Sequence, residues 1–204
     1  MNANFFKTID NEQLYYAKNF ESAPDDKPVL LFNYGLVCSS HHWSFQANHF
    51  QKNYPILIHD YRGHFQSTGK DDISKINFPQ LAKDIHDLCK HLGIKKVVLL
   101  GHSMGVNICL QLAKDYPDLV LGQVLISGTV MPVTDVMFDT NLMEFIAPFG
   151  ELALKKYPGV IEKIWKSSGH NPLVKKMIHH QGFKVENVSK EFIEIYLNKV
   201  GVLG

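Results

Sequence analysis

The residues of this chain best suited to chemistry run from Gly101 to Gly105 and read Gly-His-Ser-Met-Gly. An apolar run at 95–100 predicts a buried strand before them, and the pattern at 106–113 predicts a helix after them. Without these elements, the five residues would be an ordinary glycine-rich turn. Between a strand and a helix, G-x-S-x-G predicts a sharp turn that holds Ser103 in a strained conformation with its hydroxyl exposed. The N–H groups at the helix start favour negative charge beside it, which makes Ser103 the candidate nucleophile.

The segments around this turn alternate between strand patterns and helix patterns. Asn77 is expected to cap one helix, with Gln80 in the capping-box position, and Gly93 is expected to end it. Such alternation predicts an α/β fold, a mostly parallel sheet with helices on both faces. The expected strands are 5–9, 13–20, 28–33, 54–59, 95–100 and 121–127, and the expected helices are 42–51, 77–92 and 106–113.

The character of the sequence changes after residue 128. Strand-like runs disappear, and amphipathic helical patterns interrupted by prolines and glycines follow. We therefore expect an α/β core at 1–128 and a helical cap or lid at 129–204. The alternative is that these helices simply pack on the sheet.

Three motifs occur in order along the chain: Asn33–Leu36 after the third expected strand, Asp60–Ser67 after the fourth, and the Ser103 turn. Together they resemble the α/β-hydrolase family, in which the second motif reads D-x-R-G-x-G-x-S. The resemblance extends over essentially the whole chain. It implies that Ser103 is the nucleophile of a hydrolase with a helical cap after the sixth strand.

The resemblance also implies an oxyanion hole made of two backbone N–H groups. One would come from Met104, directly after the nucleophile, and the other from Leu36. Two residues depart from the family pattern. Tyr34 replaces the usual histidine, and its phenol would have to brace the loop through a different partner. Phe65 replaces the second glycine of the Arg-Gly loop, which suggests a locally altered turn.

The remaining members of a catalytic triad are not identifiable. The family order is serine, then an acid, then histidine. The histidines after Ser103 are His170, His179 and His180, all in the expected cap, and Asp135 and Asp139 offer at best the acid. The C-terminal strands of the family sheet are also missing from this chain. We therefore expect that a segment beyond Gly204 supplies the aspartate and histidine, or that a partner chain or a cap helix covers the last strand.

Other histidines are weaker candidates. By resemblance, His102 points away from the cleft and is not the general base. The pairs His41-His42 and His179-His180 do not share a helix face, and no nearby carboxylate pattern supports a metal site. No metal is therefore expected.

Arg62 is expected to hold its loop through hydrogen bonds rather than to bind substrate anions. The sequence contains neither G-x-G-x-x-G nor G-x-x-x-x-G-K-[ST], so a nucleotide cofactor has no support. The proposed chemistry requires no cofactor.

The composition is that of an ordinary globular protein. The 204 residues are 45% hydrophobic and 20% charged, with a formal net charge of +1, which gives no indication of a nucleic-acid partner. The N-terminus lacks a signal-peptide pattern, and no apolar run is long enough to span a bilayer. Cys38, Cys89 and Cys109 show no C-x-x-C spacing and are expected to be reduced. A cytoplasmic location is expected.

The sequence thus favours a serine hydrolase that acts on a carboxylic ester or related acyl substrate with an apolar group. Hydrolysis of C–C bonds and perhydrolysis use the same triad. A dehalogenase or epoxide hydrolase is disfavoured, because resemblance to those enzymes would call for aspartate at the position of Ser103. The alternative class is a non-catalytic ligand-binding or scaffold protein that keeps the fold without a complete triad.

Overall fold

The computed structural model describes residues 2–36, 38–69, 72–128 and 130, together with positions 152, 156, 157, 159 and 160. The chain divides into two compact units, Met1–Val130 and Met131–Gly204, and the first is described below. Almost all of the predicted cap at 129–204 lies outside the described residues, so the cap stays a prediction.

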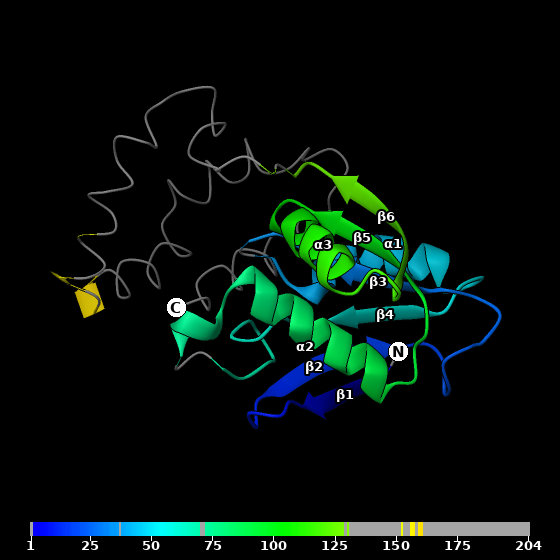
Figure 1. Ribbon diagram of the computed structural model, residues 1–204, viewed down its shortest axis with the longest axis horizontal. Coiled ribbons are helices and arrows are strands. Elements are labelled where there is room, and N and C mark those ends of the chain that lie inside the picture. The colour runs from blue at the N-terminus through cyan, green and yellow to red at the C-terminus, as the bar shows by residue number, and fades with distance from the viewer. Residues whose placement is uncertain are drawn as a thin grey trace. The chain divides into compact units, whose positions relative to one another are not determined.

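Six strands of the first unit form one sheet in the order β1-β2-β4-β3-β5-β6 (Figure 1). β1 pairs with β2 and β2 with β4 in antiparallel fashion, whereas β4 with β3, β3 with β5 and β5 with β6 form parallel pairs. The sequence prediction of a mostly parallel sheet is confirmed. The strands are β1 Asn2–Lys7, β2 Gln13–Lys18, β3 Val29–Asn33, β4 Ile56–His59, β5 Val97–His102 and β6 Val120–Ile126.

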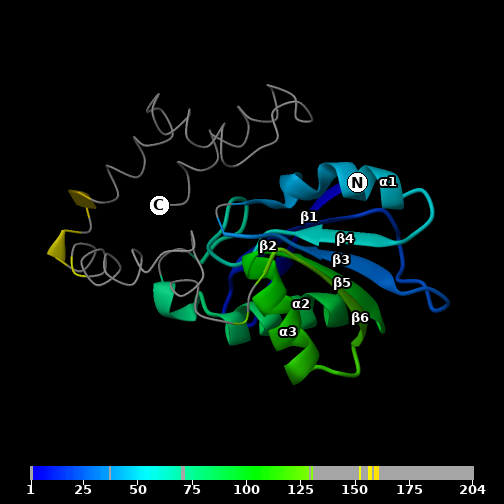
Figure 2. The ribbon, with the colours of Figure 1, turned by 90° about the horizontal axis from the view of Figure 1, so that it is seen from above.

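Helices cover both faces of this sheet, as predicted. Figure 2 shows α1 (Ser44–Phe50) on one face, and α2 (Phe78–His91) and α3 (Met104–Asp115) on the other. The expected helix at 42–51 is split, because a 3₁₀ turn, η1 (Ser40–Trp43), precedes α1. A second 3₁₀ turn, η2 (Ile73–Lys75), precedes α2. Within the described part of the chain, no helix has the length and apolar character needed to cross a membrane.

Both ends of α2 are set by the residues that the sequence indicated. Asn77 Oδ1 accepts the Gln80 N–H at 3.0 Å, as an N-cap residue should. The predicted capping box is only half formed, because the Gln80 side chain donates to Asp84 at 2.8 Å instead of returning to Asn77. The helix ends at His91, and Gly93 follows with a φ of 70°, in the left-handed region that favours glycine.

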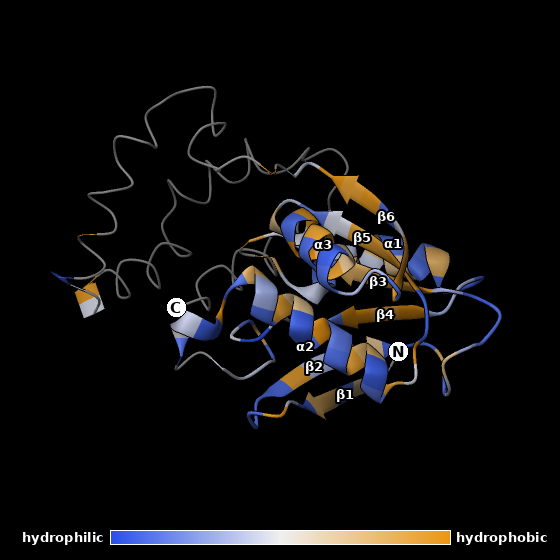
Figure 3. Ribbon diagram, viewed as in Figure 1, coloured by the Kyte–Doolittle hydropathy of each residue, from blue (hydrophilic) through white to orange (hydrophobic). Residues whose placement is uncertain are grey.

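The central and outer strands differ in burial. Every residue of β3 is buried, as expected for a strand covered on both faces. On β6, by contrast, Leu121, Val124, Leu125 and Ile126 are all exposed. Figure 3 shows the hydrophobic colouring of this strand. Among the described residues, β6 has β5 as its one neighbour in the sheet.

Candidate active site

Ser103 occupies the turn between the end of β5 and the start of α3 with a φ of 54° and a ψ of −122°. Non-glycine residues rarely adopt a positive φ, and such strain costs about 1–3 kcal/mol. Hydrogen bonds hold the residue on both sides. Its N–H donates to the Ile126 carbonyl oxygen at 3.0 Å, and its carbonyl oxygen accepts the Val106 N–H at 2.9 Å. The strained turn predicted from the sequence is confirmed.

Gly105 allows α3 to approach the end of β3 closely. A Cβ atom at this position would lie 2.2 Å from the Asn33 carbonyl oxygen and 2.9 Å from that of Tyr34. Both neighbours are backbone atoms that cannot rotate away. Gly101 has the same role within the turn, since its Cβ would lie 2.8 Å from the Gly105 carbonyl oxygen. The motif glycines are therefore required by packing.

The loop that follows β3 (residues 34–36, the β3 loop) lies directly against Ser103. A Cβ atom at Gly35 would lie 2.8 Å from Ser103 Cβ and 3.3 Å from Ser103 Oγ. Gly35 immediately precedes Leu36, a residue that is 64% exposed. Met104 is the first residue of α3, where backbone N–H groups have no partner within the helix. The fold thus brings the β3 loop and the first turn of α3 together at the serine.

Two reciprocal hydrogen bonds join the β3 loop to the loop that follows β4 (residues 60–69, the β4 loop). The Tyr61 N–H donates to Tyr34 Oη at 2.9 Å, and Tyr61 Oη donates to the Tyr34 carbonyl oxygen at 3.0 Å. Both side chains are buried, with ring centroids 4.3 Å apart. Tyr61 is therefore the partner through which Tyr34 braces its loop. It occupies an unspecified position of the D-x-R-G-x-G-x-S motif, so no signal in the sequence identified it.

The buried carboxylate of Asp60 ties the same loops together. Its two oxygens accept the Ser40 N–H at 3.0 Å and the Gln66 N–H at 3.3 Å. Burial and the charge of Asp60 raise the pKa of the Tyr34 hydroxyl well above its ordinary value, so this phenol is neutral. Phe65, in the same loop, has a φ of 44°. The turn accommodates phenylalanine in a backbone conformation that favours glycine.

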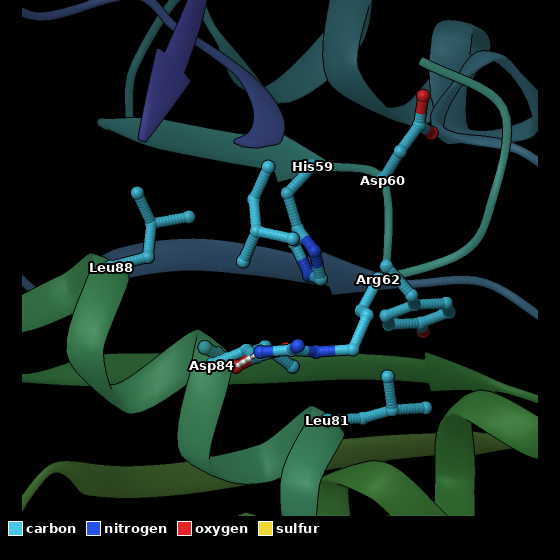
Figure 4. Close-up of a pocket in the computed structure, with 9 residues that line it drawn as sticks. His59, Asp60, Arg62, Leu81, Asp84 and Leu88 are labelled. Carbon is cyan, nitrogen blue, oxygen red and sulfur yellow. Dashed lines mark hydrogen bonds and ion pairs between the residues drawn. The ribbon is translucent and has the colours of Figure 1, made fainter. Parts of the chain in front are cut away.

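Arg62 is buried and makes four hydrogen bonds to two carboxylates. Nε and Nη2 donate to Asp84 of α2, both at 2.8 Å, and Nη1 and Nη2 donate to Asp10 at 2.6 and 3.0 Å. The hydrogen bonds from Arg62 hold the pKa of Asp10 well below its usual range. Figure 4 shows the Asp60 side chain directed away from this guanidinium. The predicted structural role of Arg62 is confirmed.

Neither of two cavities of the described fold lies at Ser103. The smaller one, about 10 Å³, is lined by His59, Arg62 and residues of α2 that include Asp84, and has room for about one water molecule (Figure 4). The other is an open groove of about 350 Å³ before the starts of β3 and β4, with Lys27, Tyr54 and Pro55 in its lining.

A buried polar chain lies behind the serine. His59 Nε2 and Asn33 Oδ1 are 3.2 Å apart, and Asn33 Nδ2 donates to Cys109 Sγ at 3.3 Å. Burial lowers the pKa of His59 to about 4 and raises that of Cys109 to about 12. The chain is therefore uncharged at neutral pH.

The other predicted candidates are not brought to the serine. His102 is partly buried, and burial lowers its pKa. His42 Nδ1 accepts the Ser39 N–H at 2.9 Å, and the described residues contain no group of three metal-ligating side chains. Over residues 2–36, 38–69 and 72–128, no histidine or carboxylate is hydrogen-bonded to Ser103 Oγ. The remaining candidates lie outside the described residues: Asp135, Asp139, His170, His179 and His180.

Known proteins share this architecture. A Haemophilus influenzae protein named "Putative esterase/lipase" is 31% identical over 126 residues, 62% of this chain and 42% of that protein. Epoxide hydrolase 1 of Caenorhabditis elegans is 30% identical over 100 residues, 49% of this chain and 25% of that protein. A solved Bacillus megaterium epoxide hydrolase matches with a TM-score of 0.74 at 18% identity, over 98% of this chain and 69% of that chain. The chain spans less than half the length of the first two relatives.

A protein-family model also matches this chain. The model described as the alpha/beta hydrolase fold matches residues 28–163. That range contains β3 to β6, the Ser103 turn and both loops that pack around it. The chain therefore belongs to the α/β-hydrolase fold family.

Proposed function

We propose that the protein is a serine hydrolase of carboxylic esters or related acyl substrates, with Ser103 as its nucleophile. The observation that carries the proposal is the contact of Gly35 with Ser103, because it holds the β3 loop beside a strained serine. The name of the Haemophilus influenzae relative agrees with this class. Epoxide opening is disfavoured, since resemblance to those enzymes would call for aspartate at this position.

In the proposed reaction, Ser103 Oγ adds to the substrate carbonyl carbon and negative charge develops on the carbonyl oxygen. The backbone N–H groups of Leu36 and Met104 would stabilise that oxygen, each by roughly 3–4 kcal/mol of barrier. The base that takes the Ser103 proton would pass it to the leaving alcohol as the C–O bond breaks, and water activated by the same base would then hydrolyse the acyl-serine ester. The exposed Leu36 side chain and the Met104 side chain would contact the acyl group, which favours an apolar one.

The serine also needs a base that removes its proton and an acid that orients the base. We place both outside the described residues, in a segment that would extend the sheet beyond β6. The exposed apolar side chains of β6 support this placement, as does the 69% of the solved neighbour that the chain spans. A partner chain against β6 is the other arrangement that would complete the sheet.

Fluorophosphonate labelling of the full-length protein tests the proposal. The probe should phosphonylate the wild-type protein at Ser103, as peptide mapping would show, and Ser103→Ala should abolish labelling with little change in the thermal transition. Ser22→Ala is the matched control, because Ser22 is an exposed loop serine before β3 and should label as wild type does. Labelling that persists in Ser103→Ala would refute the nucleophile. A folded wild-type protein that resists the probe would favour the non-catalytic alternative.

A further inference from the structure

We infer that Tyr61 is a positioning residue of the proposed oxyanion hole, because its hydroxyl fixes the backbone on which the Leu36 N–H depends. The inference rests on the proposed function, since it concerns the rate at which Ser103 reacts. It assigns a role to a side chain that touches neither the substrate nor the reacting atoms.

The first step concerns the two peptide groups on either side of Gly35. The Tyr34 carbonyl oxygen accepts from Tyr61 Oη at 3.0 Å, and the Gly35 carbonyl oxygen accepts the Cys38 N–H at 3.2 Å. A trans peptide group is planar, so its C=O and N–H point in opposite directions. The bond to Cys38 therefore directs the Leu36 N–H away from the Cys38 side.

The second step concerns the freedom of Gly35. Glycine has the widest choice of backbone conformation, so neither peptide group beside it has a strong intrinsic preference. The close contact with Ser103 excludes a side chain at this position, and the loop cannot gain rigidity from one. Hydrogen bonds from residues outside the β3 loop must therefore make it rigid. For the Tyr34–Gly35 peptide group, the donor is the Tyr61 hydroxyl.

The third step is that Tyr61 is itself held in place. Its side chain is 2% exposed, its N–H donates to Tyr34 Oη, and the two rings are in contact. Burial raises the pKa of the Tyr61 hydroxyl well above its ordinary value, so the hydroxyl stays protonated at neutral pH and can donate its hydrogen bond. A fixed donor on a fixed ring can define the orientation of the Tyr34–Gly35 peptide.

Tyr61→Phe in the full-length protein tests the inference, because it removes one oxygen atom and keeps the ring. We expect kcat for p-nitrophenyl butyrate and the rate of fluorophosphonate labelling to fall about 10-fold, through displacement of the oxyanion donor. KM should stay within about twofold, because the lost interaction acts in the transition state. Tyr16→Phe is the matched control: Tyr16 is a buried tyrosine of β2, and no hydrogen bond joins its hydroxyl to the β3 loop in the described structure. It should keep wild-type kcat.

The outcomes separate this inference from the proposed function. If the wild type and Tyr16→Phe react at Ser103 and Tyr61→Phe reacts equally fast, the positioning role is wrong and the proposed function stands. A Tyr61→Phe protein with a lower thermal midpoint and unchanged kcat would show that the hydroxyl contributes to stability alone. A folded wild type without labelling at Ser103 would overturn both proposals.

Discussion

The Ser103 turn and the Arg62 cluster (Arg62, Asp10 and Asp84) each contain a residue of the predicted motifs, yet their physical environments are opposite. At the turn, a non-glycine residue has a positive φ and the first N–H groups of α3 lack partners within the helix. In the cluster, a buried guanidinium makes four hydrogen bonds to two carboxylates. Backbone strain therefore lies where chemistry is proposed, whereas the buried charges of the cluster are paired. This contrast indicates that the Ser103 turn would serve reactivity and that the Arg62 cluster serves stability.

Arg62→Met should disrupt the cluster and leave the turn intact. Asp84 would remain buried without its cation, which typically costs about 3–5 kcal/mol of unfolding free energy. Urea unfolding measures the loss. Lys95→Met is the control, because the pair of Lys95 with Asp25 is exposed and its loss should leave stability close to that of the wild type. Two results would contradict the idea that the Arg62 cluster serves stability alone. One is an Arg62→Met variant as stable as the wild type, and the other is a folded Arg62→Met variant that is no longer labelled at Ser103.

His59 connects the two regions, since it lines the cavity beside Arg62 and bonds to Asn33, behind the turn. Its pKa is about 4 in the folded protein, below the ordinary value of 6.5, so the unfolded state binds the proton more readily. This contribution to stability is complete above pH 6.5 and is lost as the pH falls toward 4, by about 3 kcal/mol in all. Urea unfolding from pH 7 to pH 4 should show a shallower decline in His59→Gln than in the wild type. If the unfolding free energies of His59→Gln and the wild type fall equally with pH, His59 is not the group responsible for the decline.

Ser103→Gly should relieve strain at the turn. Glycine adopts a φ of 54° without the steric cost that serine bears, so unfolding free energy should rise by about 0.5–1 kcal/mol while labelling is lost. Ser103→Ala, which keeps a Cβ, should show no such gain. Differential scanning calorimetry compares the two variants. Equal midpoints would indicate that the positive φ stores no strain.

Local patterns predicted most of the fold. The apolar runs located the strands, and Asn77 and Gly93 bounded a helix through backbone chemistry that acts over a few residues. The sequence did not reveal contacts between distant segments. Arg62 and Asp10 are 52 positions apart, and Tyr34 and Tyr61 are 27 apart, so only the folded sheet brings them together.

In the candidate site, too, local features were predictable from the sequence and contacts between distant residues were not. Ser103 and its two glycines carry a local signal, since they lie in one sharp turn whose close backbone contacts require the glycines. The phenol that braces the β3 loop has none, because a hydrogen bond from an unspecified motif position leaves no pattern in the chain. The base and the acid stay predictions, because their candidates lie outside the described residues.

The contact at Gly105 bears on how this motif is inherited. A change to any other residue type adds a Cβ atom, which would meet the Asn33 carbonyl oxygen at 2.2 Å. We therefore expect a related chain that keeps this backbone geometry to keep a glycine here, whether or not that chain hydrolyses anything. The two glycines of G-x-S-x-G therefore report the shape of the turn, and they carry no information on whether the serine between them reacts.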